Sequence, residues 1–227
     1  NPLLYMEQGL TFEQLLTAVN DGRDRVERGW HVRLAWILDI PRDQPRKADD
    51  VVRWVTSAAA KKGSVVALGL SGREDAQPIA QFERPFKTAQ KKDIPRVVYA
   101  GDVLGAEGVL EAINQLEPDR IVDGWGTLDA PDVIQLLTER HISLDLCMAR
   151  ALCMGRVESY AKYPLRELYD DGITLTVNSG MPALYKTSLV DEYLAVVEHC
   201  DFSLEELEEL ALNAVRVSLL PDEEKQV

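Results

Sequence analysis

The sequence predicts an α/β fold in which strands and helices alternate along the chain. Three observations support this prediction. Short apolar runs recur, each run ends abruptly at a glycine, a proline or a carboxylate, and a stretch with helical spacing of apolar residues follows. Residues 96–102 show the pattern most clearly, because the run RVVYA leads into Gly101 and Asp102. Such alternation is typical of βα units with parallel strands, in which functional residues lie at the carboxyl ends of the strands.

The first elements follow from caps and periodicity. Thr11 and Gln14 have the spacing of a capping box, so we expect a helix over residues 11–29. Apolar side chains share one face of residues 31–40, and Pro41 follows, which predicts the first strand.

The later elements repeat this plan. A helix is expected over residues 49–62 with Gly63 as its cap, and a strand buried on both faces over residues 65–70. A helical stretch over residues 78–91 is expected to break near Pro85. The remaining predicted strands are residues 96–100, 120–122, 142–147 and 173–178. The remaining predicted helices are residues 105–113, 132–140, 165–170, 188–199 and 203–219.

These elements predict one domain over residues 1–227, because no repeat or low-complexity linker divides them. A (β/α)8 barrel typically needs about 250 residues, and the six predicted βα units fall about two units short. Two architectures stay open at this point. One is an open, doubly wound sheet, and the other is a TIM-type barrel whose first two strands are missing from the chain.

Composition excludes several classes of partner. The net charge of −13 disfavours nucleic acid and anionic lipid surfaces. No apolar run approaches the roughly 20 residues of a membrane-spanning helix, and no signal peptide is recognisable. The three cysteines make no disulfide framework, so we expect a cytoplasmic protein. The chain starts at Asn1 without an initiator methionine, which suggests part of a longer product.

The turns at the ends of these strands carry specific motifs. They read VVALGLSGRE at residues 65–74, YAGD at residues 99–102, RIVDG at residues 120–124 and NSGMP at residues 178–182. Further motifs are Cys147, the pair Tyr163-Pro164 and the closing segment from Leu212 to Lys225. In order and spacing, this series resembles the adenosine/AMP deaminase family of metal-dependent aminohydrolases over essentially the whole chain.

The resemblance implies a (β/α)8 barrel of which this chain covers about six βα units. It also implies that the first two strands, and the His-x-His pair that follows the first, lie before Asn1. In the family, zinc converts water to hydroxide, while a carboxylic acid and a histidine handle protons at the purine ring. Gly72 matches a glycine whose backbone faces that ring.

Most of the chemical positions that the resemblance locates in this chain differ from the family pattern. Tyr99 replaces a histidine that binds zinc, and Gly180 replaces an aspartate that binds zinc. Asp102 replaces the glutamate that protonates the ring, and Asp123 replaces the histidine that orients the attacking water. Met181 replaces the aspartate that holds the substrate. We therefore expect no zinc site and no cofactor in this chain.

The histidines of the sequence, considered without the family resemblance, also indicate no zinc site. A catalytic zinc site usually needs three converging ligands, and His31, His141 and His199 stand at strand starts or a helix end, where structural or surface roles are expected. Trp125 lies between two glycines and is equally suited to stacking on a flat ring and to closing the core.

Carboxylates at predicted strand ends allow two interpretations. They are Asp39, Glu74, Asp102, Asp123 and Asp145. One interpretation is an oxygen-ligand site for Mg²⁺ or Mn²⁺, or an acid–base pair, with Asp102 and Asp123 as the residues to test. The favoured interpretation is that they cap helices or pair with arginines, namely Arg42, Arg73 and Arg150.

Together these observations predict a deaminase-like barrel without family-type zinc catalysis. It would bind a purine-like or other small ligand, through Gly72, Met181 and Trp125, or serve as an assembly subunit. The alternative is a hydrolytic enzyme acting on a purine-type C–N bond through Asp102 and Asp123. A third hypothesis, a working zinc deaminase, is the weakest. Residues upstream of Asn1, or a partner chain such as a second copy in a homo-oligomer, are expected to complete the barrel, because two open sheet edges are costly.

Overall fold

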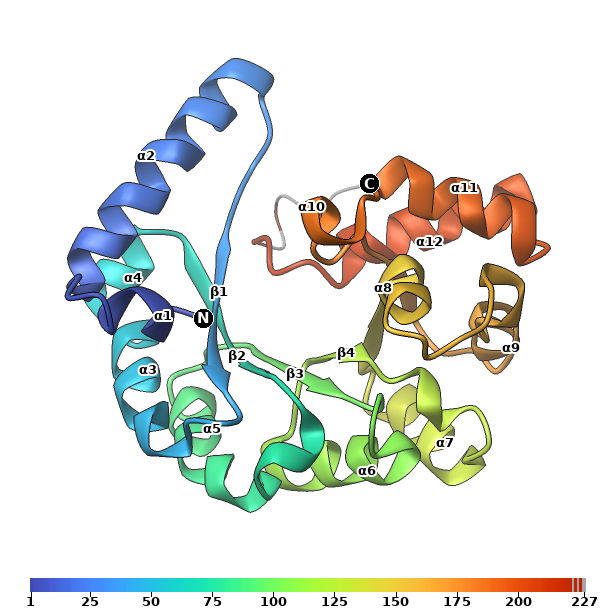
Figure 1. Cartoon of the computed structure of the whole chain (residues 1–227), viewed down its shortest axis with the longest axis horizontal. Helices are drawn as coiled ribbons and strands as arrows, with labels where there is room; N and C mark the ends of the chain where they lie inside the picture. The colour runs from blue at the N-terminus through green and yellow to red at the C-terminus, as the bar shows by residue number, and fades with distance from the viewer. Residues whose placement is uncertain (222, 224, 226–227) are drawn as a thin grey trace. The chain divides into compact units, whose positions relative to one another are not determined.

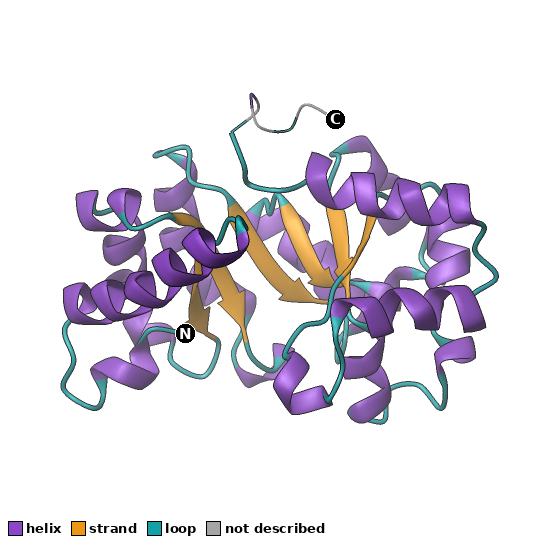
Figure 2. Cartoon of the chain, turned by 90° about the horizontal axis from the view of Figure 1, so that it is seen from above, coloured by secondary structure: helices purple, strands orange, loops and turns teal. Residues whose placement is uncertain are grey.

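The computed structural model describes residues 1–221, 223 and 225. Contacts divide the chain into two compact units. The first holds residues 1–99 and 111–118, and the second holds residues 100–110 and those from 119 onward. Strand order follows chain order in each unit, and the strand pairs β1–β2, β2–β3, β4–β5 and β5–β6 are parallel (Figures 1 and 2).

The first unit packs helices against the strands β1 to β3. Its strands are β1 (Trp36–Pro41), β2 (Val65–Ser71) and β3 (Arg96–Ala100), whose last residue belongs to the second unit. Its helices are α1 (Leu3–Met6), α2 (Phe12–Trp30), α3 (Ala48–Val55), α4 (Ala58–Lys62) and α5 (Glu83–Gln90). Helix α3 packs on β1 and β2, and α4 packs on β2. Helix α6 (Gly105–Leu116) has residues in both units.

The second unit repeats the βα plan with shorter strands. Its strands are β4 (Arg120–Asp123), β5 (Ser143–Leu146) and β6 (Leu175–Val177). Its helices are α7 (Pro131–Glu139), α8 (Met148–Cys153), α9 (Leu165–Asp170), α10 (Pro182–Tyr185), α11 (Leu189–His199) and α12 (Leu204–Arg216). Helices α11 and α12 pack on β6. In the described residues of the chain, no helix has the length and apolar character needed to cross a bilayer.

The predicted helix starts are confirmed by their caps. The Thr11 hydroxyl accepts from the Gln14 backbone N–H at 3.2 Å, and the Gln14 side chain accepts from the Thr11 N–H at 2.9 Å. Ser203 and Glu206 form the same reciprocal pair at α12. Each box satisfies two backbone donors that a helix start otherwise leaves unpaired.

Three expectations about local structure are corrected, and one helix was missed. The first strand begins at Trp36 instead of residue 31, because His31 adopts a left-handed conformation (φ 56°) that ends α2. The expected helix 49–62 is two helices, since Ser57 caps a new one. Pro85 lies in the first turn of α5, where proline is tolerated, so it causes no break. Helix α8 was not expected.

A close approach of β1 and β2 depends on a glycine. Asp39 and Gly69 are Cα partners in the parallel register. A Cβ on Gly69 would lie 1.9 Å from Asp39 Oδ1, so only glycine leaves room for that carboxyl group. Burial raises the pKa of Asp39 above its ordinary value, and a hydrogen bond with the Ser71 side chain opposes the shift.

Two glycines bring the turns after β3 and β4 together in the second unit. The Gly124 N–H donates to the Ala100 carbonyl at 2.8 Å. Gly101 has φ +87°, and a Cβ there would lie 2.7 Å from Gly124 Cα and from Val109 Cγ2. The two backbones therefore touch at the residues next to Asp102 and Asp123.

Replacing Gly101 by alanine is expected to lower the free energy of unfolding by about 3 kcal/mol, since left-handed strain and steric overlap add. Gly172→Ala is the control, because Gly172 has φ +79° with nothing within 4 Å of an added Cβ. It should cost about 1 kcal/mol. Urea unfolding of both variants checks the difference, and equal losses would contradict the tight contact.

Candidate functional site

The second unit gathers polar side chains at the carboxyl ends of its strands. Asp123 is the last residue of β4, and Asp102 lies in the turn after β3. Both carboxylates are held by arginines from one segment, which consists of α8 and the loop that follows it. Arg150 comes from α8, and Arg156 comes from the loop. The structure thus gives each predicted acid–base residue a cationic partner.

Asp123 forms a buried ion pair with Arg150. The Arg150 Nη1 donates to Asp123 Oδ2, and the two side chains are 6% exposed for the aspartate and 16% for the arginine. Asp123 also has φ 74°, a left-handed conformation that costs an L-residue about 1–2 kcal/mol. The ion pair and the contact at Gly124 offset that strain. This confirms the expectation that Arg150 pairs with a strand-end carboxylate.

Asp102 forms a second, two-point ion pair. Arg156 Nε lies 2.8 Å from Asp102 Oδ1, and Arg156 Nη2 donates to Oδ2 at 3.2 Å. The Asp102 side chain is 4% exposed and the Arg156 side chain 37%. The Nη2–Oδ2 contact is a hydrogen bond, whereas the Nε–Oδ1 contact is an ion-pair contact only. Arg156 was not singled out from the sequence, because nothing local links it to a residue 54 positions earlier.

A buried glutamate holds the start of α8 in place. The Glu192 carboxylate accepts from the backbone N–H groups of Met148 at 3.1 Å and Ala149 at 3.2 Å. Burial raises the pKa of Glu192, and these N–H donors oppose the shift. A carboxylate at the positive end of a helix is favourable. Glu192 therefore fixes the segment that carries Arg150.

The two positions that are predicted to replace zinc ligands, Tyr99 and Gly180, have different surroundings. Tyr99 is 8% exposed in the first unit, and its carbonyl accepts from Arg42 Nη2 at 2.5 Å. Gly180 has φ +59° in the second unit, and a Cβ there would lie 3.2 Å from Cys147 Sγ. Burial raises the pKa of the Cys147 thiol to about 12, with further contributions from the Asp123 and other nearby carboxylates.

The predicted ligand-binding residues belong to both units. Gly72 lies in the first unit with φ +99°, where an added Cβ would be 3.4 Å from the Arg42 backbone nitrogen. Met181 lies just before α10 in the second unit and is 54% exposed. Trp125 belongs to the second unit as well. Their predicted roles in binding stay predictions.

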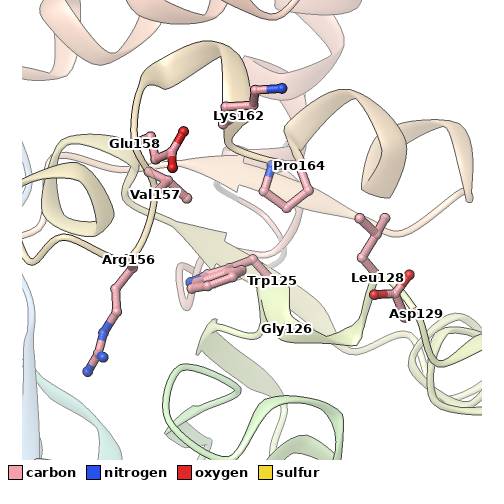
Figure 3. Close-up of a pocket in the computed structure, with 9 residues that line it drawn as sticks. All are labelled: Trp125, Gly126, Leu128, Asp129, Arg156, Val157, Glu158, Lys162 and Pro164. Atoms are coloured by element: carbon pink, nitrogen blue, oxygen red, sulfur yellow. The ribbon is translucent and has the colours of Figure 1, made fainter.

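Trp125 lines a cavity of about 380 Å³ in the second unit. Its ring lies 6.2 Å from the ring of Tyr163, tilted by 48°. Figure 3 shows the indole beneath the segment that carries Val157 and Glu158, with Pro164 also on the lining. Burial raises the pKa of Tyr163 well above its ordinary value, and the Asp123 carboxylate adds to the shift.

The other strand-end carboxylates have structural partners. Asp145 binds Arg120 and accepts from the Thr176 hydroxyl at 2.9 Å. Arg73 pairs with Asp75 at 2.5 Å instead of a strand-end carboxylate. Among the residues that the structure describes, no group of three or more His, Cys, Asp or Glu side chains is placed to hold a metal ion.

Removing Arg150 tests the buried pair. Arg150→Gln is expected to lower the free energy of unfolding by about 3 kcal/mol, because Asp123 keeps a buried charge without its partner. Arg25→Gln is the control, since the Arg25–Asp21 pair is 71% and 62% exposed and should cost less than about 1 kcal/mol. Urea unfolding of the two variants measures the contrast, and similar values would argue against a buried pair.

Thiol labelling tests the packing around Cys147. Iodoacetamide at about pH 8 is expected to label the exposed Cys153 and to spare Cys147 and Cys200. Burial raises the pKa of these two thiols, to about 12 and about 11, so they stay protonated and enclosed. Peptide mapping by mass spectrometry identifies the labelled residues. Rapid labelling of Cys147 in the folded protein would contradict this packing.

Comparison with known proteins identifies relatives along the full length of the chain. A family model described as adenosine deaminase matches residues 1–227. An adenosine deaminase of Clostridium botulinum (strain Okra / Type B1) is 30% identical over 227 residues, covering 100% of this chain and 67% of that protein. An aminodeoxyfutalosine deaminase of Streptomyces avermitilis is 28% identical, covering 96% of this chain and 62% of that protein. The chain thus spans about two thirds of these relatives.

Solved structures support the fold. An adenine deaminase from Arthrobacter aurescens superposes with a TM-score of 0.90 at 26% identity, covering 99% of this chain and 68% of that one. An Arabidopsis ADAL structure complexed with IMP superposes with a TM-score of 0.85 at 20% identity. It covers 96% of this chain and 65% of that one, and it bears on the fold alone. The predicted α/β class, with the βα units of a TIM-type barrel, is confirmed.

Proposed function

We propose that this chain, which belongs to the adenosine deaminase family, is a member without zinc-dependent deamination that binds a small ligand instead. One observation carries the proposal. The side chains that replace the family's proton-handling glutamate and histidine, Asp102 and Asp123, are both buried and ion-paired with arginines. Relatives of this chain are named as deaminases. We propose that this chain differs from them in lacking zinc-dependent deamination.

Proton transfer is disfavoured by these pairs. A guanidinium group remains protonated in proteins and has no acceptor, so neither Arg150 nor Arg156 replaces a general base. Each carboxylate already has its charge balanced by an adjacent cation. To accept or deliver a proton at a ligand, Asp102 or Asp123 would first have to leave its arginine, at a cost in buried charge.

The residues present do not fit zinc. Zinc takes cysteine, histidine or carboxylate ligands, whereas Tyr99 offers a phenol and Gly180 offers no side chain. Cys147 lies next to Gly180 and is a ligand type that zinc accepts, but among the described residues it belongs to no group of three or more such side chains placed to hold a metal ion. Arg150 adds a positive charge beside Asp123, and like charge repels a divalent cation. The side chains at Tyr99, Gly180 and Arg150 support a proposal of no zinc cofactor.

The second candidate is a hydrolytic enzyme with altered residues, acting on a purine-type or related C–N bond through Asp102 and Asp123. The backbone contact between Gly101 and Gly124 favours it, because that contact sets the two aspartates on adjacent turns. An acid and a base on adjacent turns is a workable arrangement for proton transfer. The arginine pairs weigh against it, so we place it second.

The partners and location complete the proposal. We expect a small molecule as ligand, with a purine nucleoside or base among the candidates, and neither nucleic acid nor membrane as a partner. A second copy of this chain, or another chain, is proposed as a partner. The three free cysteines fit the reducing cytoplasm, which is where we place the protein.

Zinc content and ammonia release test the proposal together. The purified protein is expected to hold well below about 0.1 zinc per chain by plasma mass spectrometry, against one in a catalytic zinc site. Ammonia release from adenosine, adenine and AMP should equal the buffer blank. Stoichiometric zinc with turnover would overturn the proposal.

Two variants separate the candidates if turnover appears. Asp102→Asn and Asp123→Asn should each abolish a reaction that uses them as acid and base, typically by at least about 100-fold. Asp50→Asn is the control, since Asp50 pairs with Arg53 on an exposed helix face. Turnover that is lost in both site variants and kept in the control would establish the second candidate.

A further inference from the structure

The cavity beside Trp125 has the size and lining of a ligand site. Its volume of about 380 Å³ lies within the range of roughly 300–1,000 Å³ usual for small-molecule pockets. Trp125, Leu128, Val157 and Pro164 supply apolar lining. The Trp125 ring lies 6.2 Å from the ring of Tyr163, which is 3% exposed. Figure 3 shows the indole on the lining of the cavity.

The charges on the cavity favour a cation. Asp129 and Glu158 line it, both exposed, and within the described residues neither has an ion-pair partner. Of the two lining cations, Arg156 is already bound to Asp102, and in Figure 3 its guanidinium points away from the other lining side chains. Lys162 remains, and its side chain in Figure 3 does not run toward Trp125.

We propose that this cavity, which Glu158 and Asp129 line, binds a small organic cation, an amine whose charge lies over the Trp125 indole. The inference rests on the proposed ligand-binding role and names the ligand class for it. Tryptophan is the strongest cation–π partner among the aromatic residues. The net charge of −13 also raises the local concentration of cations around the protein.

Competing ligand classes meet specific obstacles at this cavity. An anion would have to approach two carboxylates; of the two lining cations, Arg156 is held by the buried Asp102 and Lys162 does not run toward Trp125 in Figure 3. A neutral flat ring would gain stacking on Trp125 but would leave both carboxylates without a charge partner. An aromatic amine can contact the Trp125 ring and also attract the lining carboxylates, so it fits the cavity better than an anion or a neutral ring.

Three isosteric probes test the ligand class by isothermal titration calorimetry: benzylamine, benzyl alcohol and benzoate. Benzylamine is expected to bind at least about fivefold more tightly than benzyl alcohol, which is the scale of a cation–π contact with a carboxylate nearby. Benzoate should show no measurable binding. Tighter binding of benzoate, or equal binding of all three, would overturn the proposal.

Variants locate the binding. Trp125→Leu should abolish benzylamine binding, whereas Trp30→Leu should leave it unchanged, because Trp30 is 74% exposed in the first unit. Glu158→Gln should weaken benzylamine binding about threefold and leave benzyl alcohol binding unchanged. This variant still tests the site if Trp125→Leu fails to fold. Glu208→Gln is the matched exposed control. Benzylamine binding that is unaffected by Trp125→Leu and Glu158→Gln would overturn the site.

Failure of this inference is distinguishable from failure of the proposed function. If zinc and ammonia release are absent and no probe binds, the ligand class is wrong and the lack of deamination stands. If adenosine is deaminated while benzylamine binding still depends on Trp125 and Glu158, the proposed function fails and the cavity assignment stands. Adenosine binding that depends on Trp125, without any benzylamine binding, would replace the cation by a purine and overturn the inference.

Discussion

The buried ion pair between Asp123 and Arg150 is the interaction on which the candidate site depends. It ties the end of β4 to α8 and holds Asp123 in a left-handed backbone conformation. The pair between Asp102 and Arg156 repeats the arrangement for the turn after β3. Because both arginines lie within one short segment, its position decides the charge balance at both strand ends. Removing either residue of a buried ion pair costs free energy, so both pairs hold the aspartate side chains in fixed positions.

Two further contacts hold this segment and the two aspartates in position. Glu192 binds the first backbone N–H groups of α8 and fixes its start. The close contact of Gly101 with Gly124 sets the two aspartates on neighbouring turns. Arg156 pairs with Asp102, so Asp129, Glu158 and Lys162 are the other charged residues on the lining of the Trp125 cavity. The segment that carries Arg150 and Arg156 therefore contacts both aspartates and also contributes to the lining of the Trp125 cavity.

Much of the fold could be predicted because it depends on local sequence. Apolar runs that end in turns locate the strands, and capping boxes at Thr11 and Ser203 locate helix starts. The candidate site was harder to predict from the sequence, because its contacts link residues that are far apart in the chain. Asp102 and Arg156 are 54 positions apart, and the cap of α8 comes from Glu192, 44 positions beyond Met148. Six residues in α8 are also too few to show a period. The turn motifs pointed to Asp102 and Asp123, while their partners needed the tertiary structure.

A double-mutant cycle between Asp123→Asn and Arg150→Gln, measured by urea unfolding with and without excess zinc, would show what holds the Asp123 carboxylate. If the arginine holds it, the coupling free energy is expected to be about 2 kcal/mol or more, in line with close charge pairs. It should be the same in both conditions. A coupling below about 0.5 kcal/mol, or one that disappears when zinc is added, would mean that the carboxylate is available to a metal and would contradict the structure-based explanation.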